Sequence, residues 1–154
     1  MKGITPCLWF DTQAEEAANF YVSVFPNSRI KQVTHYGDTG PGRKGSVMTV
    51  AFDLDGQDFL GLNGGPQFKF SWAISMMVNC ETQVELDAMW NKLAAGGGAH
   101  EQCGWLRDKY GLSWQIIPAV LPQLMQDDAM TERVMKEVMK MKKLDIATMQ
   151  KAAA

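Results

Sequence analysis

The chain has 154 residues, of which 46% are hydrophobic and 21% charged, and its formal net charge at pH 7 is −2. This composition is that of an ordinary soluble protein and argues against a disordered chain, and the length suits one domain. A charge so close to zero predicts no nucleic-acid partner, because phosphate binding needs a clustered excess of Lys and Arg. No apolar run approaches the roughly 18 residues of a membrane span, so we expect a cytoplasmic protein with no membrane partner.

The three cysteines argue against a disulfide-bonded protein and against a structural zinc site. Cys7, Cys80 and Cys103 form no CxxC pair, and three thiols cannot all pair within one chain. This usage fits a reducing compartment and predicts no structural zinc site.

The first half of the chain reads as one strand, one helix and three further strands. Residues 4–11 predict a strand and 14–25 an amphipathic helix, with Thr12 as N-cap and Glu15 completing a capping box. The three further strands are expected at 29–36, 46–54 and 58–63. Asp55-Gly56 suits a tight hairpin between the last two, and the glycine content of 37–45 predicts a mobile loop.

The same order then begins again. The pattern predicts a strand at 70–80, a helix at 82–95 and strands at 100–107 and 112–118, with a hairpin turn at 108–111. At a constant offset of 70, DTQAEEAANFY aligns with ETQVELDAMWN, which places Thr12 on Thr82 and Phe20 on Trp90. The agreement of cap, core positions and element order indicates an internal duplication.

Two such units predict an α+β fold in which each helix covers the outer face of a curved mixed sheet and the concave faces form a cup. We place the units at about 1–66 and 67–118. Residues 119–154 are expected to add a helical extension to the same domain, with Asp127 or Thr131 capping one helix and Asp145 the next.

Four segments carry a resemblance to a known family: ITPCLWFDTQAEEAANFYVSVFPNS, FLGLNGGPQFKF, CGWLRDKYGLSWQIIP and RVMKEVMKMKKLDIATMQKA. They resemble the PhnB-like branch of the vicinal oxygen chelate superfamily, which includes glyoxalase I, bleomycin-resistance proteins and extradiol dioxygenases. Members of the branch often carry the name 3-demethylubiquinone-9 3-methyltransferase. The resemblance implies paired βαβββ modules, a homodimer, and a small-molecule ligand in the cupped sheet.

Metal-dependent members of the superfamily hold their ion with four His, Glu or Gln side chains, one from each of four strands. The corresponding positions here are Ile4, Gly61, Ala73 and Gln115, of which only Gln115 can ligate, and a shift of one residue gives no better set. We therefore predict no cofactor. The alternative is a metal-dependent lyase, isomerase or dioxygenase, although three of the four metal-ligand positions carry residues that cannot bind an ion. A methyltransferase is disfavoured, because no glycine-rich turn joins a strand to a helix.

The last strand alternates in a way that divides its side chains between two faces. Alternation alone does not say which set faces the cup. Because the resemblance places Gln115 at a metal-ligand position, we assign Ser113, Gln115 and Ile117 to the cup and Leu112, Trp114 and Ile116 to the helix-covered face. The complete set predicted to contact ligand is Leu8, Asn63, Ser75, Trp105, Ser113 and Gln115. A mostly apolar pocket with a few amide and hydroxyl groups suits a small aromatic or amide-bearing molecule.

One thiol is a candidate for chemistry. Cys103 lies three residues after His100, and a nearby imidazole would lower the pKa of the thiol. Ordinary packing is the alternative for this cysteine, and Arg107 and Asp108 read as exposed turn residues. The sequence therefore predicts a protein that binds, or binds and converts, a small organic molecule in a metal-poor cavity. A purely structural dimer is a third interpretation.

Overall fold

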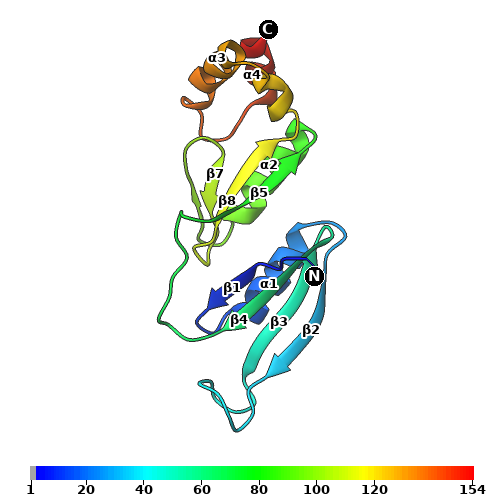
Figure 1. The fold of residues 1–154 in the computed structure, drawn as a ribbon, viewed down its shortest axis with the longest axis vertical. Helices are drawn as coiled ribbons and strands as arrows, with labels where there is room; N and C mark the ends of the chain where they lie inside the picture. Colours follow the sequence, from blue (N-terminus) through cyan, green and yellow to red (C-terminus); the bar gives the residue numbers. More distant parts are fainter. Residues whose placement is uncertain (1–2) are drawn as a thin grey trace. The chain divides into compact units, whose positions relative to one another are not determined.

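Each half of the chain folds into a strand, a helix and three further strands, as the duplication predicts (Figure 1). The computed structural model describes residues 3–154 and divides into one unit that ends at Phe70 and a second unit, Ser71–Ala154. The α+β class and the C-terminal helices are confirmed. No helix within residues 3–154 is both long and apolar enough to cross a bilayer.

The first unit contains five elements: β1 (Cys7–Phe10), α1 (Ala14–Val24), β2 (Arg29–His35), β3 (Val47–Leu54) and β4 (Gln57–Asn63). Its sheet has the order β1-β4-β3-β2, in which β1 runs parallel to β4 and the other pairs are antiparallel. The hairpin between β3 and β4 turns at Asp55-Gly56, where both residues have positive φ, as expected for this dipeptide.

The second unit repeats this topology. Its elements are β5 (Ser75–Cys80), α2 (Gln83–Ala94), β6 (Ala99–His100), β7 (Trp105–Arg107) and β8 (Ser113–Pro118), in the sheet order β5-β8-β7-β6. The chain continues through a 3-10 helix η1 (Leu121–Met125) into α3 (Asp128–Val138) and α4 (Ile146–Ala153). Asp127 and Asp145 cap α3 and α4 by accepting backbone N–H bonds from Met130 and Thr148.

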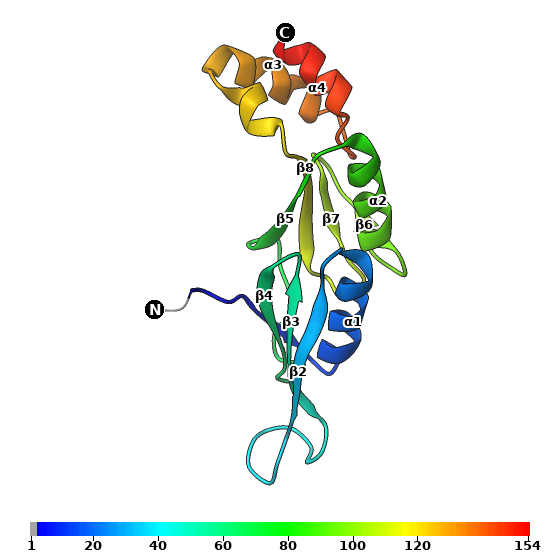
Figure 2. The ribbon, with the colours of Figure 1, turned by 90° about the vertical axis from the view of Figure 1, so that its right-hand side faces the viewer.

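Helix α1 packs on one face of the first sheet and α2 on one face of the second (Figure 2), and the opposite face of each sheet, which its helix does not cover, is its open face. In the first unit Gly61 of β4 faces α1 so closely that a β-carbon there would lie 3.2 Å from the β-carbon of Ala14. In the second unit Leu86, Trp90 and Leu93 of α2 are buried, as are Leu106, Trp114 and Ile116 of the sheet. Each unit therefore has its own small hydrophobic core.

Strand ends differ from the predictions. The first strand begins at Cys7 instead of residue 4, and Ile4 is 88% exposed. The fifth strand begins at Ser75 instead of residue 70, so Ala73 lies outside it. Strand β5 begins where its parallel partner β8 begins, at the Ser75–Ser113 pair, because a strand extends only as far as its ladder of hydrogen bonds.

The predicted strand 100–107 is also wrong as a single element. It divides into β6 and β7, which pair as a tight antiparallel hairpin. Cys103 and Gly104 in the connecting turn have φ of 57° and 81°, a conformation that reverses the chain and ends a strand.

The two equivalent helices begin in different ways. Thr82 caps α2 by accepting the N–H of Glu85 at 3.2 Å, but the predicted cap at Thr12 is wrong, because Gln13 is the N-cap of α1 and makes no side-chain capping bond. Instead, Asn63 at the end of β4 accepts the N–H of Ala14 at 2.8 Å. The sheet register places Pro118 at the equivalent end of β8, and proline has no side-chain acceptor.

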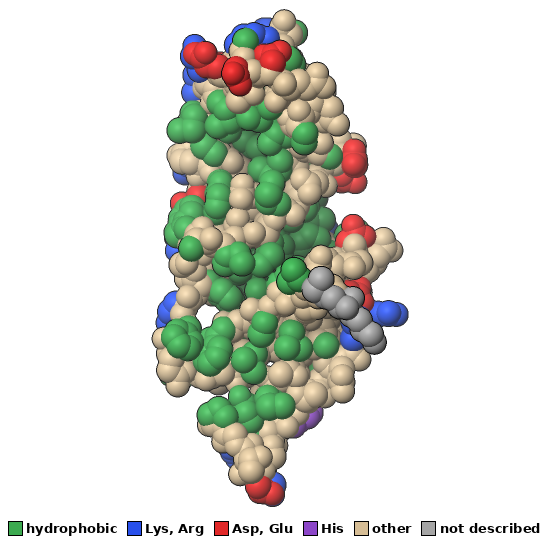
Figure 3. All heavy atoms as spheres, in the orientation of Figure 1, with side chains coloured by type: hydrophobic (Ala, Val, Ile, Leu, Met, Phe, Trp, Pro, Cys, Tyr) green, Lys and Arg blue, Asp and Glu red, His purple; other side chains and the backbone are tan. Residues whose placement is uncertain are grey.

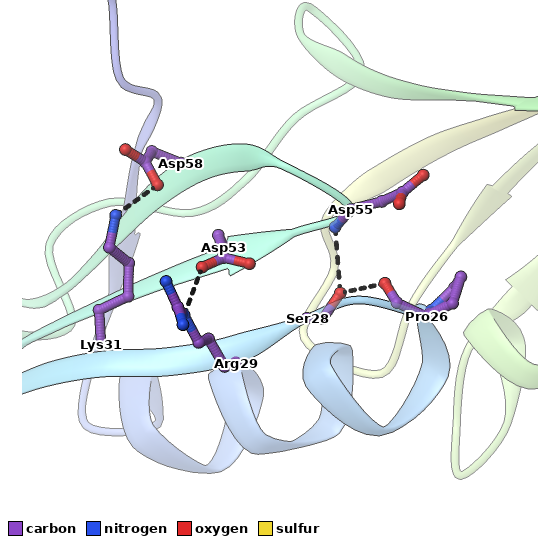
Figure 4. A network of polar contacts seen from close by, with 7 residues as sticks. All are labelled: Pro26, Ser28, Arg29, Lys31, Asp53, Asp55 and Asp58. Carbon is purple, nitrogen blue, oxygen red and sulfur yellow. Dashed lines mark hydrogen bonds and ion pairs between the residues drawn. The ribbon is translucent and has the colours of Figure 1, made fainter.

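Polar contacts join the α1–β2 connection to the β3–β4 hairpin (Figure 4). Asp55 donates its backbone N–H to Ser28 Oγ at 3.1 Å, and this hydroxyl donates to the carbonyl of Pro26 at 2.8 Å. Arg29 pairs with Asp53 across β2 and β3. Because the Arg29 side chain is 77% exposed, although that of Asp53 is only 14% exposed, the ion pair contributes about 1 kcal/mol or less.

Candidate ligand-binding site on the open face of the second sheet

Four of the predicted site residues lie on the face of the second sheet that α2 leaves bare. Register pairs Ser75 with Ser113 and places Gln115 opposite both Met77 and Trp105. Paired residues project to the same side of a sheet, and their neighbours Leu106, Trp114 and Ile116 are buried on the α2 side. The predicted division of β8 into two faces is therefore confirmed. Apolar side chains cover much of the open face (Figure 3).

The polar groups of this face include one hydrogen-bonded pair and one buried hydroxyl. Gln115 Nε2 donates to Ser75 Oγ at 2.8 Å. Ser113 is 0% exposed, and its Oγ has no hydrogen-bond partner among residues 3–154. A buried hydroxyl without a partner costs about 1–3 kcal/mol, so this atom stands out among the side chains of the sheet.

Aromatic rings lie beside these polar groups. The rings of Trp72 and Trp105 are 5.8 Å apart, and the guanidinium of Arg107 lies 5.7 Å from the ring centre of Trp72. Arg107 also donates from Nε to Glu101 at 3.0 Å, which holds the guanidinium in place. Trp72 is 50% exposed, and Ile74 and Met77 are more exposed still. Such a surface can stack a planar ligand.

Leu8 and Asn63, the two predicted site residues of the first unit, lie on the face that α1 covers. Leu8 pairs with Gly61 and is only 5% exposed. The predicted face is wrong by one residue, because Gly61 must face the helix to admit Ala14. The open face of this sheet instead carries Cys7, Trp9, Leu60 and Leu62.

Asn63 has both ends of its side-chain amide hydrogen-bonded within the first unit. Its Oδ1 accepts from the Ala14 N–H, and its Nδ2 donates to the carbonyl of Val47 at 3.1 Å. Its own carbonyl accepts from Tyr36 Oη at 2.6 Å. The residue thus ties helix α1, strand β3 and Tyr36 to the end of β4.

Asp108, in the turn before β8, is buried, although the sequence predicts an exposed turn residue at this position. Asp108 is 3% exposed, and its carboxylate accepts bonds from the N–H groups of Tyr110 and Leu112 and from Trp114 Nε1. It is a buried anchor of the hairpin and not an exposed turn residue. The D-x-x-G spacing that predicts the turn also allows this bonding, but burial of the carboxylate depends on Trp114.

Cys103 and His100 have separate partners. The thiol of Cys103 lies 3.7 Å from Met139 Sδ, and its backbone N–H donates to Met141 at 2.8 Å. The His100 ring stacks on Trp90 with centroids 4.4 Å apart, and its Nε2 lies 3.0 Å from the Trp90 carbonyl. The geometry therefore gives no support to activation of this thiol by this imidazole.

A metal centre needs several ligating side chains close together. Within residues 3–154 no three His, Cys, Asp or Glu residues gather in an arrangement that could hold an ion. On the open face of the second sheet, Gln115 is the predicted ligand position, and its amide nitrogen is engaged with Ser75.

Comparisons with known proteins identify relatives of this fold. The family described as 3-demethylubiquinone-9 3-methyltransferase matches residues 2–117. The structure is similar to that of a putative 3-demethylubiquinone-9 3-methyltransferase, PhnB protein, from Bacillus cereus, with 40% identity and a TM-score of 0.69 over 77% of this chain and 100% of that chain. Protein PA1353 from Pseudomonas aeruginosa shares the fold, with 19% identity and a TM-score of 0.62 over 74% and 95% of the two chains. No curated protein matches the chain at a significant level.

Proposed function

The chain belongs to the PhnB-like family described as 3-demethylubiquinone-9 3-methyltransferase, and from this premise we propose that it binds a small, uncharged aromatic or amide-bearing molecule on the open face of the second sheet. Ser75, Trp105, Ser113 and Gln115 form the proposed site. Within the proposal the protein is a cytoplasmic homodimer of the vicinal oxygen chelate type and needs no metal.

The observation that carries the proposal is the Ser113 hydroxyl. It is fully buried, has no partner within residues 3–154, and shares its sheet face with the Gln115–Ser75 pair. A fold tolerates such a group at a cost of about 1–3 kcal/mol, and a ligand that bonds to the hydroxyl removes this cost. The ligand's own polar group is therefore expected beside Ser113.

The surrounding side chains favour an uncharged planar ligand. Trp72 and Trp105 offer ring faces for stacking, and the Gln115 amide can both donate and accept a hydrogen bond. Arg107 is paired with Glu101 at 3.0 Å, so this guanidinium is not available to select an anion. An aromatic primary amide has both the ring and the hydrogen-bonding groups that this face can recognise.

The methyltransferase activity in the family's description finds no support in the side chains. Cofactor-dependent methyl transfer of the common type needs a glycine-rich turn that leads from a strand into a helix. Here the glycine-rich segment 37–45 joins the antiparallel strands β2 and β3, and Gly64-Gly65 leads into an irregular segment before β5. Neither presents a helix N-terminus to a cofactor.

Titration of the full-length protein with benzamide, followed by tryptophan fluorescence and native mass spectrometry, tests the proposal. Saturable quenching with one benzamide per subunit is expected, together with weaker binding of cyclohexanecarboxamide, which lacks the ring, and of toluene, which lacks the amide. Ser113→Ala should bind benzamide about tenfold more weakly, which corresponds to one lost hydrogen bond of about 1.4 kcal/mol.

Ser71→Ala is the matched control, because Ser71 is exposed and lies outside the sheet. It should leave benzamide binding unchanged. Equal loss of binding in both variants, or no difference between benzamide and toluene, would falsify the proposed site. Native mass spectra of the gently purified protein also report subunit number, bound metal and any retained molecule. One metal ion per subunit would favour the metal-dependent alternative.

A further inference from the structure

A cavity of about 490 Å³ lies within the first unit, apart from the sheet face discussed above. It forms where β1 and β4 end, between the start of α1 and the base of the β2–β3 hairpin. Its volume falls in the range of small-molecule sites. The residues around it include three charged side chains: Asp11, Glu15 and Arg43.

These charges are opposite in sign and do not neutralise one another. Asp11 and Glu15 come from the β1–α1 side, and Arg43 comes from the hairpin loop. Within residues 3–154 none of the three side chains forms an ion pair or a hydrogen bond, so neither carboxylate is in contact with the guanidinium. Opposite charges that share a cavity without contact leave room for a molecule that carries both complementary charges.

The walls of the cavity are held by buried contacts. Asn63 bonds to Ala14 and Val47, and Tyr36 Oη donates to its carbonyl, so one residue joins three sides of the cavity. Trp9 Nε1 donates to the carbonyl of Gly65 at 2.9 Å and fixes the fourth side. These contacts hold the backbone walls in place before any ligand arrives, which reduces the ordering cost of binding.

We propose that this cavity binds a small zwitterion, a molecule with an ammonium group and a carboxylate a few atoms apart, such as an amino acid or a dipeptide. Asp11 and Glu15 receive the ammonium, which donates three hydrogen bonds, and Arg43 receives the carboxylate in a two-pronged contact. Asp11, Glu15 and Arg43 together carry a net charge of −1, and a zwitterion leaves that net charge unchanged while each of its ends meets the opposite charge. The site is independent of the function proposed for the second unit.

Glycylglycine is the probe, added to the uniformly 15N-labelled full chain. The expected result is saturable movement of the backbone amide signals of the cavity walls, those of Gly42, Ser46, Gly64 and Gly65. Acetate carries only the negative charge and ethylammonium only the positive charge. Each should bind at least about tenfold more weakly than glycylglycine, because acetate can pair only with Arg43 and ethylammonium only with Asp11 and Glu15. Arg43→Gln and Glu15→Gln should each weaken glycylglycine binding by about tenfold or more.

Neighbouring residues provide matched controls. Glu16→Gln removes the same charge from the first turn of α1, and Lys44→Gln removes a positive charge from the same loop, yet neither residue lines the cavity. Both should bind glycylglycine as the unmodified chain does. Three results would overturn the proposal: no movement of the four amide signals, movement by acetate as strong as by glycylglycine, or equal weakening in the control variants.

Discussion

Gly42 lies against the ring of Tyr36 so closely that a β-carbon on the glycine would come well within 3.0 Å of three ring carbons. The ring cannot retreat, because Tyr36 is 7% exposed and its hydroxyl donates to the Asn63 carbonyl. The glycine-rich loop 37–45 is thus folded onto an anchored side chain. The absence of a side chain at Gly42 makes this approach possible.

The first prediction follows from that contact. Gly42→Ala should lower the free energy of unfolding by about 1–3 kcal/mol through overpacking against Tyr36. Gly37→Ala is the control in the same loop, because no atom lies within 4 Å of its β-carbon position and its φ is not positive. It should change stability by less than about 0.5 kcal/mol. Urea denaturation of both variants measures the difference, and equal midpoints would contradict the prediction.

Among the polar residues of the first unit, Asn63 should cause the largest loss of unfolding free energy when it is replaced by alanine. Asn63→Ala leaves the buried N–H of Ala14 and the carbonyl of Val47 without partners, so we expect a loss of about 2–3 kcal/mol in urea denaturation. Asn63→Asp keeps the acceptor for Ala14 and should cost less. Thr82→Ala removes the corresponding cap of α2 and should cost about 1 kcal/mol. A smaller loss for Asn63→Ala than for Thr82→Ala would refute this ranking.

Gln83 fastens the C-terminal extension to α2. Its Nε2 donates to the carbonyl of Leu144 at 3.1 Å, and its Oε1 accepts the N–H of Ile146 at 2.9 Å. Gln83→Ala should therefore speed tryptic cleavage at Lys142 and Lys143, about tenfold for each 1.4 kcal/mol of local stability lost.

Gln13→Ala is the control for this variant. Gln13 is the aligned residue of the first unit, and among residues 3–154 its side chain accepts a hydrogen bond only from the neighbouring N–H of Thr12. The cleavage rate in the C-terminal extension should not change in this variant. Equal rates for Gln83→Ala and the unmodified chain would show that α3 and α4 are held by their apolar contacts alone.

Cys80 links stability to pH in the alkaline range. Burial, reinforced by the negative charge of Glu85, raises the pKa of its thiol from 9.0 to about 11. The folded state keeps the proton where the unfolded chain releases it, so this contribution is complete below pH 9 and is lost as the pH rises toward 11. Cys80→Ala should show a shallower fall in stability over this interval, measured by urea denaturation at several pH values. Parallel curves for the two proteins would contradict the raised pKa.

The accuracy of sequence-based prediction depended on how local each signal is. Thr82 with Glu85, and the alternation from Leu112 to Ile117, lie within a few residues, and both the α2 cap and the division of β8 into two faces are confirmed. The family resemblance at Gln115, and not the alternation, indicated which of the two faces the helix leaves open. Gly61 has no side chain to reveal its direction, so the predicted face of the first sheet was wrong by one residue. The unpartnered Ser113 hydroxyl and the cavity near Arg43 arise from tertiary packing, which no short pattern encodes.

Because α1 and α2 are capped in different ways, their N-terminal turns can form at different stages of folding. Helix α2 carries its cap three residues from the group that it satisfies, so this start can form as soon as the segment is synthesised. Helix α1 obtains its cap from a residue 49 positions downstream, so a ribosome must release the whole first unit before the helix start is complete. An isolated peptide 80–97 should therefore be more helical than peptide 10–27, although the second helix emerges later from the ribosome.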